Sequence, residues 1–126
     1  MTTDTRILVF PWFGKPAGRA TQHGFARNLV WHFDEAQHEA AEEGNVSASW
    51  TLSPNETTKS VWAHDFLLTY TITLTADALM AKLGVKNTDQ AGQFTFSTLL
   101  HTYFGVQNIA DVQVHGLKGA SRGILA

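Results

Sequence analysis

The sequence contains no cysteine. A disulfide framework, a thiolate zinc site and a thiol nucleophile are therefore all excluded. The histidines fall at no spacing typical of metal ligands, so we expect no metal site from them. The chain also lacks the P-loop order, a dinucleotide-binding glycine pattern and a GxSxG elbow. These absences give no support for nucleotide binding or for serine-based acyl transfer.

Charge is sparse and nearly balanced. Only 16% of the 126 residues are charged, and the formal net charge is −2. Because no run of basic residues occurs, neither nucleic acid nor an anionic membrane is an expected partner. No apolar stretch has the length of a membrane span or the form of a signal-peptide core. We expect a single domain over residues 1–126, with a cytoplasmic location.

Alternating apolar residues are the clearest structural signal. From Phe66 to Leu74, large apolar residues alternate with threonine, which is the pattern of a half-buried strand. The same alternation occurs at 46–52 and 79–85, and turn-forming residues flank each segment. Further strands are predicted at 7–13, 28–33, 93–104 and 111–115. Short strands at this spacing predict an all-β sandwich or barrel.

The helix-like segment in this reading is 34–43, which is rich in good helix formers. It has no apolar stripe that could pack against a sheet. We therefore interpret it as a solvated connection between strands.

Basic residues are concentrated near the start of the chain. Between Thr5 and Phe33 the sequence has no acidic residue, and its basic residues are Arg6, Lys15, Arg19 and Arg27. Such a cluster could hold a small anion such as a sugar phosphate. The alternative is that the uneven charge only solvates surface loops.

One histidine, His101, lies within the apolar and aromatic stretch "FSTLLHTYFGVQNI". Strand alternation places His101 on one face with Ser97, Leu99 and Tyr103, a mixed polar and aromatic surface that suits a ligand-binding concavity. A histidine in such a place could act as a general acid near neutral pH. The alternative is a hydrogen-bonded structural histidine.

Four ordered motifs resemble a known family. They are "VFPWFG", "QHGFARN" leading into Trp31, "LLHTYF" and "VHGL". Together they span about Leu8 to Gly119. The chain resembles the glucose-6-phosphate 1-epimerases, the hexose-6-phosphate mutarotase branch of the aldose 1-epimerase family.

This resemblance implies an antiparallel β-supersandwich of the galactose mutarotase type, of which 1–126 would form about half. It implies a cofactor-free isomerase that opens and recloses the ring of an aldohexose 6-phosphate. His101 would be the acid, and the general-base glutamate would lie in the other half. Gln22 and Arg27 would contact sugar and phosphate, and His23 would line the sugar site. A non-catalytic sugar-phosphate-binding module and an inactive remnant remain alternatives.

Overall fold

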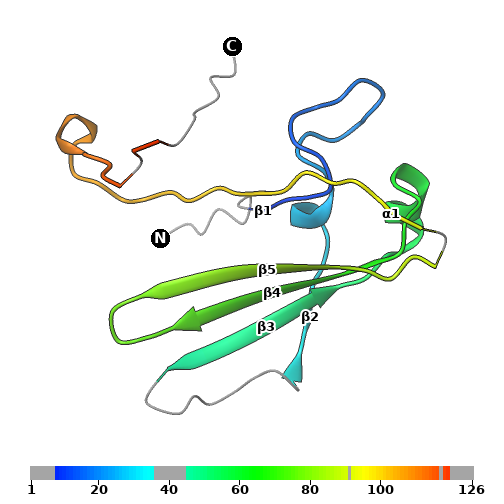
Figure 1. The fold of residues 1–126 in the computed structure, drawn as a ribbon, viewed down its shortest axis with the longest axis horizontal. Helices are drawn as coiled ribbons and strands as arrows, with labels where there is room; N and C mark the ends of the chain where they lie inside the picture. The colour runs from blue at the N-terminus through cyan, green and yellow to red at the C-terminus, as the bar shows by residue number, and fades with distance from the viewer. Residues whose placement is uncertain (1–7, 36–44, 91, 117, 120–126) are drawn as a thin grey trace.

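The computed structural model describes residues 8–35, 45–90, 92–116 and 118–119. Within these residues the chain is mainly antiparallel β-sheet, with one α-helix and two short 3₁₀ helices (Figure 1). The elements in chain order are β1 (Leu8–Val9), a 3₁₀ helix (Ala26–Asn28), β2 (His32–Phe33), β3 (Val46–Leu52), α1 (Glu56–Val61), β4 (Phe66–Leu74), β5 (Leu79–Asn87), β6 (Leu99–Leu100) and a 3₁₀ helix (Ile109–Asp111). The predicted all-β class is confirmed.

The larger sheet has four strands in the order β2-β3-β4-β5, and all its neighbours are antiparallel. The strands predicted at 46–52 and 66–74 are confirmed with the same bounds. The third predicted strand is longer than expected. The alternation predicts a turn after Val85, but Lys86 and Asn87 continue β5 and pair with Leu67 and Phe66 of β4.

The two faces of this sheet have the characters that the alternation predicted. Phe66 and Leu68 are buried on the apolar face, with relative exposures of 1% and 0%. On the other face hydroxyl groups pair across β3 and β4, and the Ser49 and Thr71 oxygens lie 2.8 Å apart. Cross-strand hydroxyl pairs of this kind add modestly to sheet stability.

Aromatic rings form the centre of the core. Phe10 is fully buried, and its ring centroid lies 5.4 Å from that of Trp62 and 5.6 Å from that of Phe66. Phe25 packs edge-on to Phe10 at 6.1 Å. Offset and edge-to-face rings at these separations stabilise a core beyond the area they bury. The core therefore joins the apolar face of the sheet to the segment that carries Phe10 and Phe25.

A second, two-stranded sheet pairs β1 with β6, with Leu8 opposite Leu100 and Val9 opposite Leu99. Figure 1 shows the chain after β5 returning across the molecule and passing β1. The pairing thus brings residues near 100 beside the first described strand.

Three predicted strands are wrong in extent, and a fourth is absent. Of 7–13, 28–33 and 93–104, only Leu8–Val9, His32–Phe33 and Leu99–Leu100 are strands, with residue 7 outside the described residues. The segment 111–115 contains no strand, and a 3₁₀ helix at Ile109–Asp111 overlaps its start. Apolar alternation fits the surface of a sheet, but a strand also needs a neighbouring strand to bond its backbone groups.

Helix α1 was missed by the sequence reading. The Asn55 side chain accepts a hydrogen bond from the Thr58 amide at 2.9 Å, and the Thr58 hydroxyl accepts one from the Asn55 amide at the same distance. This reciprocal capping box satisfies amides that the first helical turn leaves without partners.

The predicted connection at 34–43 lies outside the described residues except for Asp34 and Glu35.

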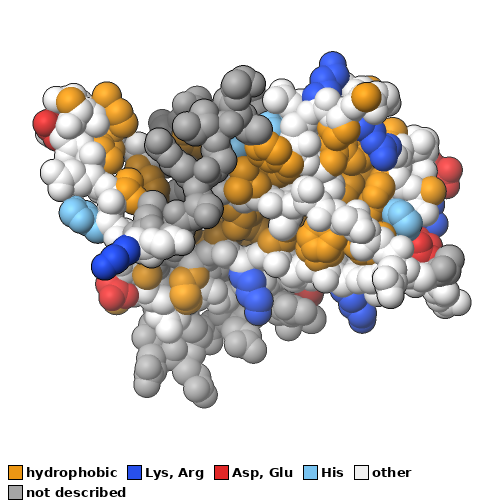
Figure 2. Space-filling view, turned by 45° about the horizontal axis from the view of Figure 1, so that its top comes forward, with side chains coloured by type: hydrophobic (Ala, Val, Ile, Leu, Met, Phe, Trp, Pro, Cys, Tyr) orange, Lys and Arg blue, Asp and Glu red, His pale blue; other side chains and the backbone are white. Residues whose placement is uncertain are grey.

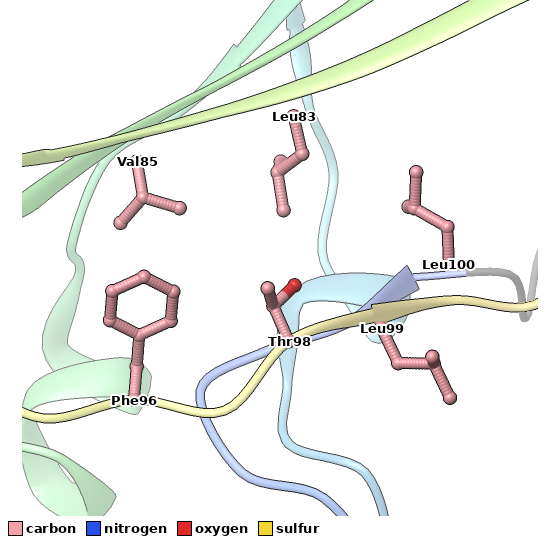
Figure 3. A pocket seen from close by; sticks show the side chains of 6 residues that line it. All are labelled: Leu83, Val85, Phe96, Thr98, Leu99 and Leu100. Atoms are coloured by element: carbon pink, nitrogen blue, oxygen red, sulfur yellow. The ribbon is translucent and has the colours of Figure 1, made fainter. Parts of the chain in front are cut away.

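An open apolar groove of about 500 Å³ lies between β5 and the segment that includes β6 (Figure 3). The side chains that line it are Leu83, Val85, Phe96, Thr98, Leu99 and Leu100. Apolar side chains also form patches on the face seen in Figure 2. No helix in the described part of the chain has the length and apolar character needed to cross a bilayer.

Candidate sugar-phosphate site

The "QHGFARN" motif is fixed to the core through Gly24. Gly24 has φ of 74° and forms a parallel bridge with Phe10. The Phe10 carbonyl accepts hydrogen bonds from the Phe25 amide at 2.9 Å and the Ala26 amide at 3.3 Å. A Cβ on Gly24 would lie 1.9 Å from the Phe10 carbonyl oxygen, so only glycine permits this approach. The side chains on either side of Gly24 therefore have a rigid anchor.

His23 is held in a positive-φ conformation, with φ of 63°. Its amide donates to the Gly14 carbonyl at 2.7 Å, and its Nδ1 accepts from the Gly14 amide at 3.0 Å. The ring centroid of Phe13 lies 5.0 Å from that of the imidazole. A non-glycine residue at positive φ has a conformational cost, which the two bonds to Gly14 offset.

His101 follows directly after β6, so the pairing of β6 with β1 sets its position. Two further bonds secure this segment. The Thr98 hydroxyl donates to the Val9 carbonyl, and the Ser97 amide donates to the Pro11 carbonyl, both at 2.8 Å. As a result, the His101 ring centroid lies 5.6 Å from that of His23. The structure brings together two histidines that are far apart in the sequence.

Arg27 and Gln22 meet through the backbone. An Nη atom of Arg27 donates to the Gln22 carbonyl at 2.8 Å, while the Gln22 side chain is exposed. The Arg27 Nε is buried and has no hydrogen-bond partner among the described residues. An unsatisfied buried donor is unusual and is often explained by a bound water or ion.

The other basic residues of the N-terminal segment do not share this arrangement. Arg19 lies 4.5 Å over the Trp12 ring and donates to the Val61 carbonyl, so its guanidinium has structural contacts. Lys15 is exposed, and Arg6 lies outside the described residues.

Electrostatics favours a neutral His23. Partial burial is the main cause that lowers the pKa of His23, and the Arg27 guanidinium and His101 lower it further. An imidazole that is neutral near pH 7 has one N–H donor and one acceptor. Imidazoles beside a guanidinium can donate hydrogen bonds to sugar oxygens.

Comparison with known families agrees with these motifs. The family model described as aldose 1-epimerase matches residues 2–123. The chain belongs to the aldose 1-epimerase family. It is 39% identical over 111 residues to "Putative glucose-6-phosphate 1-epimerase" of Escherichia coli, a match that covers 87% of this chain and 35% of that protein.

Two further relatives carry the same name. The Salmonella typhimurium protein is 36% identical over 111 residues, covering 87% of this chain. The Cenchrus ciliaris protein is 31% identical over 115 residues, covering 88%. The chain spans about a third of the length of each. No solved structure gives a significant match.

Neither of two acidic residues near the strands and the C-terminal segment, Asp65 and Asp111, has the contacts of a general base in this aldose 1-epimerase family member. Asp65 forms an ion pair with Lys59 at 2.9 Å. The hydrogen bond between the two side chains is the main cause that raises the pKa of Lys59. Asp111 is exposed and accepts from the Asn108 side chain at 3.0 Å.

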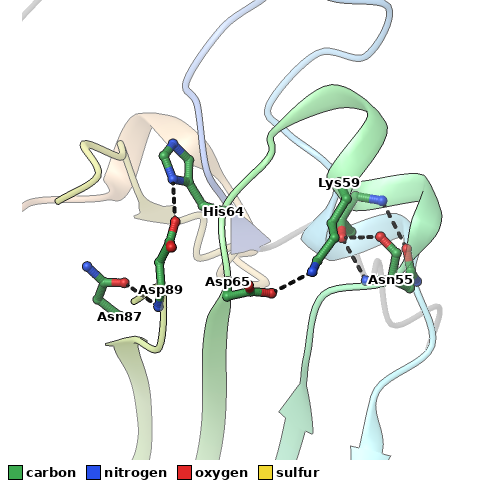
Figure 4. Close-up of polar contacts among 7 residues, drawn as sticks. Asn55, Lys59, His64, Asp65, Asn87 and Asp89 are labelled. Carbon is green, nitrogen blue, oxygen red and sulfur yellow. Dashed lines mark hydrogen bonds and ion pairs between the residues drawn. The ribbon is translucent and has the colours of Figure 1, made fainter. Parts of the chain in front are cut away.

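A further histidine, His64, lies just before the start of β4 (Figure 4). His64 Nδ1 is 3.1 Å from an Asp89 carboxylate oxygen, and the His64 ring contacts those of Trp62 and Phe94 at 4.7 and 5.4 Å. The sequence reading assigned His64 no role. These contacts join the start of β4 to the turn after β5, so His64 has a structural role. No group of three or more potential metal ligands occurs within the described ranges.

The sequence reading also missed Gly14. Its amide and carbonyl contact His23, but backbone groups carry no sequence signal beyond the glycine itself. Gly14 has a φ of 69°, and a glycine between Phe13 and Lys15 could have indicated such a positive φ.

Proposed function

We propose that this chain carries part of the sugar-phosphate site of a hexose-6-phosphate 1-epimerase, which interconverts the α and β anomers of an aldohexose 6-phosphate. The observation that supports this most directly is the approach of His23 to His101, at 5.6 Å between ring centroids. Family membership and the printed names of the relatives agree with it. Glucose 6-phosphate is the substrate to test first.

The proposed reaction needs proton transfer at two oxygens. A base removes the proton from the C1 hydroxyl while an acid protonates the ring oxygen, and the C1–O5 bond breaks to give the open aldehyde. Rotation about C1–C2 and reclosure by the reverse proton transfers give the other anomer. His101 is the proposed acid. No cofactor takes part in these steps.

Substrate contacts are assigned to the "QHGFARN" segment. Arg27 would bind the phosphate, since a planar guanidinium matches phosphate oxygens with two parallel hydrogen bonds. Its buried Nε, which has no partner in the described part of the chain, supports this assignment, because an anion nearby would satisfy it. Gln22 and His23 would contact sugar hydroxyls.

Anomer exchange of glucose 6-phosphate, measured by NMR exchange spectroscopy, tests this proposal. Because the resemblance places the general base in another part of the protein, we expect this chain to accelerate exchange only modestly, and His101→Ala to abolish that acceleration. His32→Ala is the matched control, because His32 is an exposed histidine of the strand β2. Equal rates for His101→Ala and the unsubstituted chain would contradict the role of His101.

Calorimetry distinguishes the proposed epimerase from the alternative, a non-catalytic binding module. That alternative predicts glucose 6-phosphate binding without faster exchange. Arg27→Lys is the informative variant in both cases, because it keeps the charge and loses the planar fork. A folded chain that neither binds glucose 6-phosphate nor accelerates its exchange would overturn both readings.

A further inference from the structure

The contact between Gly14 and His23 fixes the protonation of one imidazole nitrogen. A backbone amide can only donate, so the His23 Nδ1 that lies 3.0 Å from the Gly14 nitrogen must present a lone pair. In neutral histidine the proton then resides on Nε2. The second bond, from the His23 amide to the Gly14 carbonyl at 2.7 Å, holds the same two residues in register.

Neighbouring groups limit the rotation of this ring. The Phe13 ring centroid lies 5.0 Å from that of His23, and the His101 ring meets His23 nearly edge-on, with an interplanar angle of 70°. The next residue, Gly24, is bridged to Phe10. The backbone and the ring of His23 therefore both have defined positions, and flipping the ring would break the bond from Gly14.

We propose that the Gly14 amide is a positioning group that holds His23 in its Nε2–H form, so that His23 offers the sugar phosphate a hydrogen-bond donor and cannot accept its protons. The ligand atom at Nε2 is then an oxygen that accepts a hydrogen bond, such as a hydroxyl, ring or phosphate oxygen. This leaves His101 as the proton-transferring imidazole of the pair. The assignment of the ligand rests on the proposed function.

The charges around His23 agree with this division of roles. Burial is the largest effect that disfavours a positive charge on the His23 ring, and the Arg27 guanidinium and His101 add to it. A proton on Nδ1 would also face the Gly14 N–H. Two donors facing each other repel, so the geometry and the electrostatics favour the same neutral form.

Long-range ¹H–¹⁵N correlation spectra of the full chain with ¹⁵N-labelled histidine test the tautomer without any ligand. The His23 signals are identified by their loss in His23→Asn. We expect a protonated Nε2 and an unprotonated Nδ1 above pH 6.5, the ordinary pKa of histidine. A proton on Nδ1, or an average of both tautomers, would overturn the proposal.

Two variants separate the acceptor from the donor. Asn places its Oδ1 near the Nδ1 position and tolerates positive φ, so His23→Asn keeps the acceptor for Gly14 and removes the distal donor. Gln places an amide N–H near the Nε2 position, so His23→Gln keeps the donor and removes the acceptor. We expect glucose 6-phosphate binding to weaken about tenfold in His23→Asn, and by less in His23→Gln.

Denaturation should show the reverse order for stability. The free energy of unfolding of His23→Asn should be closer to that of the unsubstituted chain than the free energy of unfolding of His23→Gln is. Equal binding by His23→Asn and the unsubstituted chain would refute the donor role. If the unsubstituted chain binds no glucose 6-phosphate, the proposed function fails, and the spectrum alone decides the tautomer.

Discussion

Replacing Gly24 by alanine should be among the most damaging single changes in this chain. The added Cβ would lie 1.9 Å from the Phe10 carbonyl oxygen, 2.3 Å from the Phe10 carbonyl carbon and 2.7 Å from the Pro11 nitrogen. All three atoms belong to the backbone, so no side-chain rotation relieves the contact. The bridge between Phe10 and Gly24 must open.

The cost can be estimated from what the opening removes. Holding a non-glycine residue at φ of 74° costs about 1–2 kcal/mol. Losing the bonds from the Phe25 and Ala26 amides to the Phe10 carbonyl costs about 1 kcal/mol each. We therefore expect Gly24→Ala to lower the free energy of unfolding by about 3–4 kcal/mol, before any displacement of the buried Phe25 ring.

Urea denaturation followed by tryptophan fluorescence measures this loss. Gly18→Ala is the matched control, because Gly18 has a similar φ of 79° but no atom of the described residues within 4 Å of the place where a Cβ would be added. The control should lose only the conformational part, about 1–2 kcal/mol. If Gly24→Ala costs no more than Gly18→Ala, the close approach to Phe10 does not exist as described.

Three further predictions use the same denaturation assay. Asn55→Ala should cost about 1 kcal/mol by removing the helix cap, whereas the exposed Ser60→Ala should be nearly neutral, and equal costs would argue against the capping box. Phe66→Ala should cost about 3–5 kcal/mol because this ring is 1% exposed, whereas Val30→Ala, 81% exposed, should change stability by less than about 0.5 kcal/mol. Because the folded state lowers the pKa of His23, the neutral ring stabilises the fold above pH 6.5, and this contribution is lost as the pH falls through the folded-state pKa. His23→Asn should therefore be less sensitive to pH below 6.5 than the unsubstituted chain, and identical pH profiles would contradict the lowered pKa.

Local patterns predicted the central sheet well. Strands β3 and β4 were predicted with the correct bounds, because every second side chain must face the same environment along a paired strand. Helix α1 was not predicted, because Ser53, Pro54 and Asn55 are turn-forming residues and were interpreted only as the turn after the preceding strand, although Asn55 and Thr58 occupy the positions of a capping box. That error lay in the interpretation of the pattern.

The ends of the chain were harder to predict for a different reason. Segments 93–104 and 111–115 have strand-like sequences, yet only Leu99–Leu100 pairs with another strand. Side-chain patterns show which face a segment could bury, whereas strand formation depends on a neighbour elsewhere in the chain.

The sequence by itself determined the all-β class, the central strands and, through its motifs, the family of this protein. It also singled out His23 and His101 separately. Only the tertiary structure decided that their rings lie 5.6 Å apart and that Gly14 bonds the first of them. Alternation and capping are set by residues a few positions apart, whereas the histidine pair depends on the pairing of β1 with β6, whose partners lie far apart in the chain.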